Sequence, residues 1–125
     1  MPVIVCAADD RTTTTASGKT VGLAAPSQGS AELSSWRVTM NAGAQGPTHA
    51  IDREQIWMPL AGRFEFTADG ETVAVAAGGA VVLPAGVVRR VRAAEGPAEA
   101  IVCMAVGGLA TIPGNDERHR LPWAE

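Results

Sequence analysis

The sequence is poor in aromatic residues, with no tyrosine, two phenylalanines and three tryptophans among 125 residues. Small aliphatic residues must therefore build most of the core. No apolar run approaches the roughly 20 residues that a membrane helix needs. The formal net charge is -3, whereas domains that bind nucleic acid usually carry a net positive charge. We therefore expect neither a membrane nor a nucleic acid as a partner.

Cysteine is also scarce, and the two cysteines, Cys6 and Cys103, lie far apart without a neighbouring histidine. This spacing does not match a zinc module. We expect both to be small buried residues in strands, and a disulfide between them stays open. Residues 1–5 lack the charged and apolar regions of a secretory signal, which predicts a cytoplasmic location.

The length suits one compact domain over residues 1–125. With 46% hydrophobic residues and a small net charge, the chain can bury a core and is not a disordered segment. We expect a central core at about residues 36–105. An N-terminal strand with loops (1–31) precedes it, and a C-terminal tail (106–125) follows it.

Short alternating segments separated by turn residues dominate this core. In residues 33–40, Trp36, Val38 and Met40 share one face. Strands are expected at residues 3–6, 33–40, 54–60, 62–67, 72–75, 80–83, 87–92 and 98–105. Residues 11–19 predict a loop or hairpin, and residues 68–71 predict a hairpin turn around Asp-Gly.

Only the tail, residues 115–123, leaves room for a helical turn, and we expect Trp123 to pack against the barrel or a partner subunit. Many short strands at regular spacing indicate an all-β sandwich or barrel.

Two segments resemble the paired motifs of the cupin family of small jelly-roll barrels. The first motif, G-x5-H-x-H-x3,4-E-x6-G, matches at Gly43, His49 and Gly62, and the second, G-x5-P-x-G-x2-H-x3-N, at Gly78, Pro84 and Gly86. The resemblance implies a cupin double-stranded β-helix, that is, a jelly-roll barrel.

The same resemblance implies a divalent metal held by three histidines and a glutamate, but only His49 is retained here. Ile51, Gln55 and Arg89 stand at the other three ligand positions, and Ala93 replaces the final asparagine. A catalytic metal usually needs three protein ligands, and a guanidinium has no acceptor and repels a dication. We therefore expect no metal and no cofactor, while a divalent metal at His49 stays open.

Four residues are candidate site residues because the motif register points them into the barrel, together with Ile51. Arg89 offers a bidentate fork to a ligand anion; the alternatives are an ion pair with Glu54, Glu65 or Asp52, or a solvated position. His49 is the candidate catalytic acid or base, or else a loop histidine bonded to a neighbour.

The other two candidates are ligand-binding residues. Gln55 can orient a substrate carbonyl or instead satisfy backbone groups. Trp57 can stack on an aromatic ligand or instead fill the core.

These residues predict a protein that binds a small-molecule ligand, and three functions fit. The first is a metal-independent enzyme of isomerase, cyclase or lyase type, acting on a small anionic or carbonyl compound. The second is a non-catalytic ligand-binding or sensory barrel, and the third is a metal-dependent dioxygenase with an irregular site. The resemblance also implies a homodimer, for which residues 3–6 are a candidate pairing edge.

Overall fold

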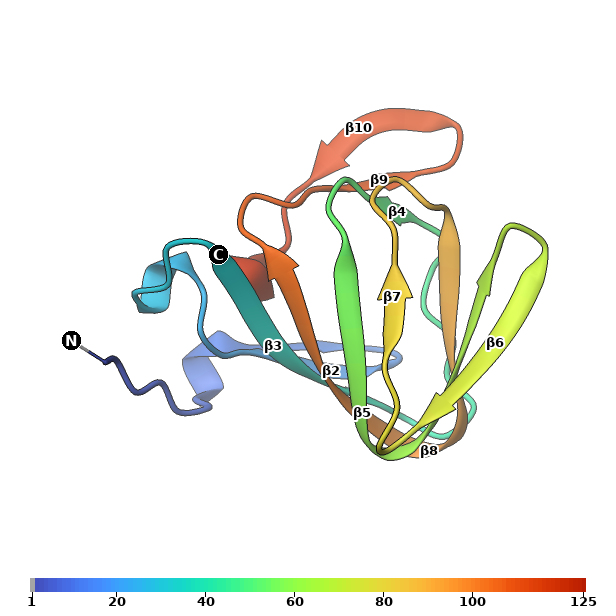
Figure 1. Ribbon diagram of the computed structural model, residues 1–125, viewed down its shortest axis with the longest axis horizontal. Coiled ribbons are helices and arrows are strands. Elements are labelled where there is room, and N and C mark those ends of the chain that lie inside the picture. The colour runs from blue at the N-terminus through green and yellow to red at the C-terminus, as the bar shows by residue number, and fades with distance from the viewer. Residues whose placement is uncertain (1) are drawn as a thin grey trace.

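The computed structural model describes residues 2–125, and they form a nearly all-β barrel (Figure 1). Its strands are β1 (Thr12–Thr15), β2 (Gly18–Gly22), β3 (Leu33–Met40), β4 (Ala50–Ile51), β5 (Gln55–Ala68), β6 (Glu71–Ala76), β7 (Val81–Leu83), β8 (Arg89–Ala105), β9 (Ala110–Ile112) and β10 (Asn115–His119). Three short 3-10 turns are η1 (Asp9–Arg11), η2 (Pro26–Gln28) and η3 (Pro122–Ala124). The expected jelly-roll fold class is confirmed.

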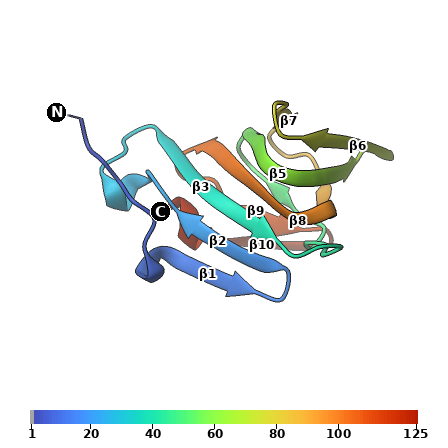
Figure 2. The ribbon, with the colours of Figure 1, turned by 90° about the horizontal axis from the view of Figure 1, so that it is seen from below.

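The strands form two sheets that enclose the core. The larger sheet has the order β1-β2-β3-β8-β5-β6, with β7 also paired to β5, and the smaller sheet has the order β10-β9-β4. Figure 2, seen from below, shows the larger sheet as a twisted ribbon with β9 and β10 behind it. The long strand β8 lies between β3 and β5, so it joins segments that are distant in the sequence.

Two pairs of expected strands are single bent strands. The expected strands 54–60 and 62–67 fall in β5, which begins one residue later at Gln55, and the expected strands 87–92 and 98–105 fall in β8, which begins two residues later at Arg89. The register between β5 and β8 shifts between Pro59 and Phe64, where both strands bend. At this bend Gly62 has a φ of +68°, and a Cβ there would lie 2.4 Å from the Glu95 carbonyl oxygen. Only glycine allows this close backbone approach.

The core fills the space between the sheets with the few aromatic residues that the chain has. Trp57 packs edge-on against Phe64 and Phe66, with ring centroids 5.6 and 5.2 Å apart. Inward-facing alanines of β8, such as Ala93 and Ala100, leave room for these rings. Trp36, Val38 and Met40 are all buried in the same core.

The N-terminal prediction is wrong in two respects. Residues 3–6 form no strand, and Cys6 is exposed, so neither a paired edge nor a buried cysteine exists there. Val3 and Ile4 are exposed, and the segment does not pair with β1, the edge strand of the larger sheet. The β1–β2 hairpin confirms the expectation for residues 11–19. Both cysteines are free.

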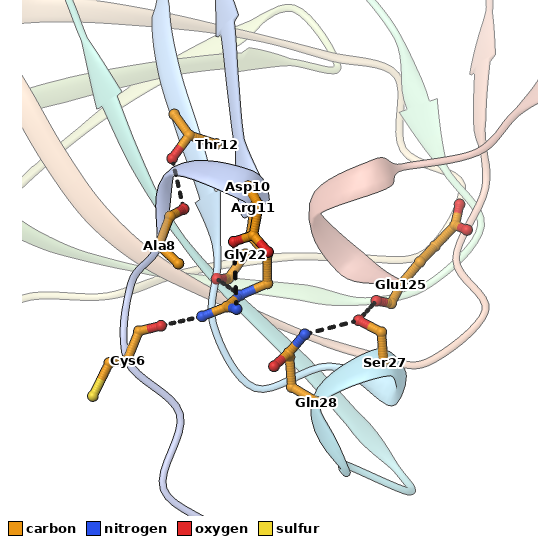
Figure 3. A network of polar contacts seen from close by, with 9 residues as sticks. All are labelled: Cys6, Ala8, Asp10, Arg11, Thr12, Gly22, Ser27, Gln28 and Glu125. Atoms are coloured by element: carbon orange, nitrogen blue, oxygen red, sulfur yellow. Dashed lines mark hydrogen bonds and ion pairs between the residues drawn. The ribbon is translucent and has the colours of Figure 1, made fainter.

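Polar contacts hold the N-terminal segment against β2 and the last residue of the chain against η2. Arg11 donates to the backbone carbonyls of Gly22 and Cys6, and the Ser27 hydroxyl donates to the carbonyl of Glu125 (Figure 3). The tail forms strand β10 and turn η3 instead of one helical turn over residues 115–123. Trp123 packs against the core as expected. Within residues 2–125, no helix is long and apolar enough to span a bilayer.

Candidate anion site inside the barrel

The candidate site lies where the segment before β4 runs beside the start of β8. The His49 amide donates to the Arg89 carbonyl over 3.0 Å, and the Arg89 amide donates back to the His49 carbonyl over 2.8 Å. In such an antiparallel pair both side chains project to the same side. This backbone pairing therefore places His49 and Arg89 next to each other, although 40 positions separate them.

Arg89 is directed into the barrel, with only 2% of its surface exposed, while its neighbour Arg90 is exposed. Period-two alternation explains the difference, because Val91 and Ala93 of β8 are also buried. Nη2 of Arg89 donates to Oε1 of Gln55 over 2.7 Å. Among the described residues, Nε and Nη1 of Arg89 have no hydrogen-bond partner.

The three carboxylates considered as partners for Arg89 do not pair with it. Glu65 pairs with Arg92 at 2.9 Å, Asp52 pairs with Arg53 at 3.4 Å, and Glu54 is exposed. None of the ion pairs formed within residues 2–125 includes Arg89. Burial without a counter-charge lowers the pKa of Arg89 to about 10. The guanidinium is therefore a desolvated cation at neutral pH.

Gln55 links Arg89 to the aromatic core. Its Oε1 accepts a second hydrogen bond from Trp57 Nε1 at 3.2 Å, and its Nε2 lies 3.5 Å from the sulfur of Met104. Gln55 thus bonds to side chains, and not to the backbone groups that we considered for it. Trp57 is 9% exposed and belongs to the core described above.

The linking role of Gln55 was missed from the sequence. Motif spacing gives the positions of ligand residues but no hydrogen bonds among the residues that replace them. Met104 contacts Gln55 from β8. Period-two alternation with Val102 predicts only that the Met104 side chain faces the core, and not that it meets Gln55.

His49 is half-buried, and its imidazole has a defined tautomer. Nδ1 lies 2.8 Å from the carbonyl oxygen of Pro47. A carbonyl oxygen only accepts, so Nδ1 carries the proton and Nε2 of the neutral ring carries the lone pair. Burial lowers the pKa of His49, the bond to Pro47 raises it, and the charge of Arg89 lowers it. The net pKa is lower than usual, so the ring is neutral at pH 7.

The residues at this site do not fit the family's metal. Ile51 is buried at 1% exposure and supplies no donor atom, and Arg89 fills the third histidine position with a cation. The only amide oxygen at the site, Oε1 of Gln55, already accepts from Arg89 and Trp57. Across residues 2–125, no three histidine, cysteine, aspartate or glutamate side chains are grouped closely enough to hold a metal ion.

Solved structures with this architecture come from several bacteria. KdgF from Halomonas sp. is 24% identical, with a TM-score of 0.62, over 70% of this chain and 76% of that one. A variant of oxalate decarboxylase from Bacillus subtilis is 17% identical, with a TM-score of 0.74, over 84% and 30%. These two likenesses establish the fold alone.

The structure of DMSP lyase DddQ from Ruegeria pomeroyi DSS-3 is 26% identical, with a TM-score of 0.62, over 70% of this chain and 46% of that chain. No curated protein matches this chain. The family model described as a cupin domain matches residues 36–106, more than half of the chain. Together with the two-sheet barrel, this match shows that the chain belongs to the cupin family.

Proposed function

We propose that the chain binds a small organic anion in its barrel through Arg89, and that His49 moves a proton to or from the bound compound without a metal. The reaction would be of the isomerase, cyclase or lyase type, on a small anionic or carbonyl compound. One observation carries this proposal: the guanidinium of Arg89 is buried without any carboxylate partner among the described residues.

The energetics of burial support an anionic ligand. A buried charge is costly unless it is paired and hydrogen-bonded. Here one neutral amide oxygen accepts from the guanidinium, and Nε and Nη1 lack partners within residues 2–125. A ligand carboxylate or enolate oxygen supplies both the missing acceptor and the missing negative charge.

Proton transfer follows from the tautomer of His49 and the position of Arg89. Nε2 of the neutral imidazole can take a proton from a carbon next to the ligand carbonyl. The electron pair from that C–H bond moves onto the carbonyl oxygen, where the positive charge of Arg89 stabilises the enolate. Return of the proton at another carbon gives an isomer, and loss of a leaving group from the next carbon gives a lyase product.

The likeness to a protein named as a DMSP lyase, at 26% identity, is compatible with the lyase branch. The alternative function is a barrel that binds its ligand without catalysis. It is favoured by one observation: the polar side-chain contacts of Arg89 and Gln55 within the described chain include no carboxylate and no second imidazole. A binding site needs no second acid or base, whereas catalysis with His49 as the single proton-transfer group is limited.

The test of binding is titration of the protein with acetate and pyruvate, followed by NMR. The Arg89→Ala variant should bind both anions about 10- to 150-fold more weakly, the loss expected for one charged hydrogen bond of about 1.5–3 kcal/mol. Arg90→Ala is the matched control, because Arg90 is the exposed neighbour on the same strand. Equal affinity in the wild type and Arg89→Ala would contradict the proposed anion site.

The test of catalysis is exchange of deuterium from heavy water into the methyl group of pyruvate and of other short oxo acids. The wild type should accelerate this exchange, and His49→Gln should lose the acceleration while it still binds the acids. Binding without accelerated exchange for any oxo acid would favour the non-catalytic alternative. Metal analysis of the purified protein tests the dioxygenase alternative, which a stoichiometric transition metal would revive.

The homodimer expected from the family resemblance remains a prediction. Its suggested edge at residues 3–6 is not a strand, so pairing through that segment is removed from the proposal. Light scattering on the purified full chain measures the oligomeric state directly.

A further inference from the structure

The outer face of the larger sheet is apolar where β3, β8, β5 and β7 lie side by side (Figure 1). Cys103 of β8 is the register partner of Ser35 in β3 and of Ile56 in β5, and Ile56 is also the partner of Val82 in β7. Paired side chains project to the same side of a sheet. These four residues therefore form one row across the face that points away from the core.

The positions around this row have the same character. Ile101 of β8 is the register partner of Met58 in β5, while Leu60 follows along β5 and Leu33 lies at the start of β3. Leu33, Met58, Leu60 and Val82 are between 37% and 60% exposed, and the other three are partly exposed. We call these seven side chains the outer patch: Leu33, Ile56, Met58, Leu60, Val82, Ile101 and Cys103.

The two central strands are apolar on both faces in this region. Residues 56–60 of β5 and 100–105 of β8 contain no charged side chain. A strand with one face in water normally alternates apolar and polar residues, whereas an unbroken apolar run is typical of a strand covered on both faces. Contiguous exposed apolar patches also mark interaction sites. The pattern therefore indicates that a partner covers the outer patch.

The charges on this face favour a second copy of the chain as that partner. In β3, β7, the first half of β5 and the second half of β8, the charged side chains are Arg37 and Glu99. They pair with each other at 3.0 Å, and the Thr39 hydroxyl donates to the same carboxylate. This part of the face is thus neutral within itself. An identical face is not repelled by it, whereas a partner recognised by charge would need an unpaired group there.

We propose that the outer patch is the interface of a homodimer in which the larger sheets of two copies pack face to face. Sheets stacked in this way lie about 10 Å apart with interdigitated side chains. The four strands span up to about 26 Å by 19 Å, or about 500 Å². Two copies together would bury about 1,000 Å², near the lower limit for a specific interface. The dimer is therefore reversible, and it depends on neither the anion site nor residues 3–6.

The experiment measures the dissociation constant of the full chain by sedimentation over a range of protein concentrations. Val82→Glu should raise it at least tenfold, because a symmetric interface would bury the new charge twice. Val73→Glu is the matched control and should leave it unchanged. Val73 is 49% exposed against 56% for Val82, and its register partner is the buried Phe66, so it lies on the opposite face of the sheet.

A second variant and a measurement on the wild type give independent tests. Met58→Glu places the charge on β5 instead of β7 and should weaken the dimer by a similar factor. Alkylation by iodoacetamide needs no substitution, because Cys103 lies in the outer patch and Cys6 is exposed outside it. Dilution of the wild type should speed the alkylation of Cys103 relative to that of Cys6.

Three results would overturn the proposal. The first is a wild type that stays monomeric up to millimolar concentration, which would leave the outer patch to a different protein. The second is a dimer that both Val82→Glu and Met58→Glu leave intact, since its interface then lies elsewhere. The third is an equal loss with Val73→Glu, which would trace the effect to added charge in general. The anion site is tested separately by acetate binding, so either proposal can fail without the other.

Discussion

Arg89 shows how one side chain can oppose stability while it serves binding. Its guanidinium is buried beside a neutral amide, and its pKa of about 10 reflects the cost of holding a charge there. Strained or uncompensated groups of this kind persist at sites where a ligand completes them. The ligand-free protein is therefore less stable than its core alone would allow.

Replacement of Arg89 by methionine should raise the free energy of unfolding of the ligand-free protein by about 2 kcal/mol. Oε1 of Gln55 keeps its bond to Trp57, so the substitution leaves that acceptor satisfied. The folded-state pKa lies below the unfolded value, so the penalty is complete below pH 10 and is relieved only at higher pH. Urea unfolding at pH 7 measures the gain; a loss of stability would show that Arg89 is already compensated.

His49 should titrate below the ordinary histidine value of about 6.5. Since the unfolded chain takes up this proton at higher pH than the folded one, His49 lowers the free energy of unfolding as the pH falls below about 6.5. The imidazole Cε1 proton, assigned with a His49→Gln variant, reports the pKa by NMR. Arg89→Met should move that pKa upward, because burial remains but the neighbouring charge is gone; an unchanged value would place the two groups out of electrostatic contact.

Much of the candidate site could be predicted residue by residue, because motif spacing and alternation specify which positions face inward. Spacing directed Arg89, Gln55 and Ile51 inward, and all three are buried. The bonds among them could not be predicted. Whether Gln55 meets backbone or side chains depends on how β5, β7 and β8 pack, which is a tertiary property.

At the scale of elements, the bend of β5 and β8 shapes the barrel, and Gly62 permits it. Gly62→Ala should lower the free energy of unfolding by about 3 kcal/mol, since its Cβ would collide with backbone atoms of residues 95–98. Gly78→Ala is the control: it also has a positive φ but has open space around it. That substitution should cost only about 1 kcal/mol. Equal losses in urea unfolding would refute the steric explanation.

The same bend explains why strand boundaries were predicted less well than strand positions. The strands expected from the sequence leave a break at residue 61 and another at residues 93–97. In both places the ladder continues beyond an irregular stretch. Turn residues mark a break in local geometry, and a bulge inside a long strand needs the same residues as a loop between two short ones.

At the scale of the whole molecule, the two ends of the chain are held to different degrees. Residues 2–7 form no strand, while Leu121 and Ala124 are buried and the Ser34 hydroxyl donates to the Ala124 carbonyl over 2.6 Å. Deletion of residues 2–7 should cost less than about 1 kcal/mol of stability. Trp123→Ala should cost about 2–3 kcal/mol, because Trp123 packs on the core. Thermal unfolding compares the two variants; the reverse order would contradict this account.

The position of β8 in the chain matters during synthesis. β3 and β5 each leave the ribosome before β8, the strand that lies between them in the finished sheet. At about 5–20 residues per second, the stretch from the end of β5 to the end of β8 takes roughly 2–7 seconds to make. During that time the edges of β3 and β5 that later pair with β8 are unpaired in the nascent chain. The yield of folded protein in a cell therefore depends on protection of these edges until residue 105 emerges.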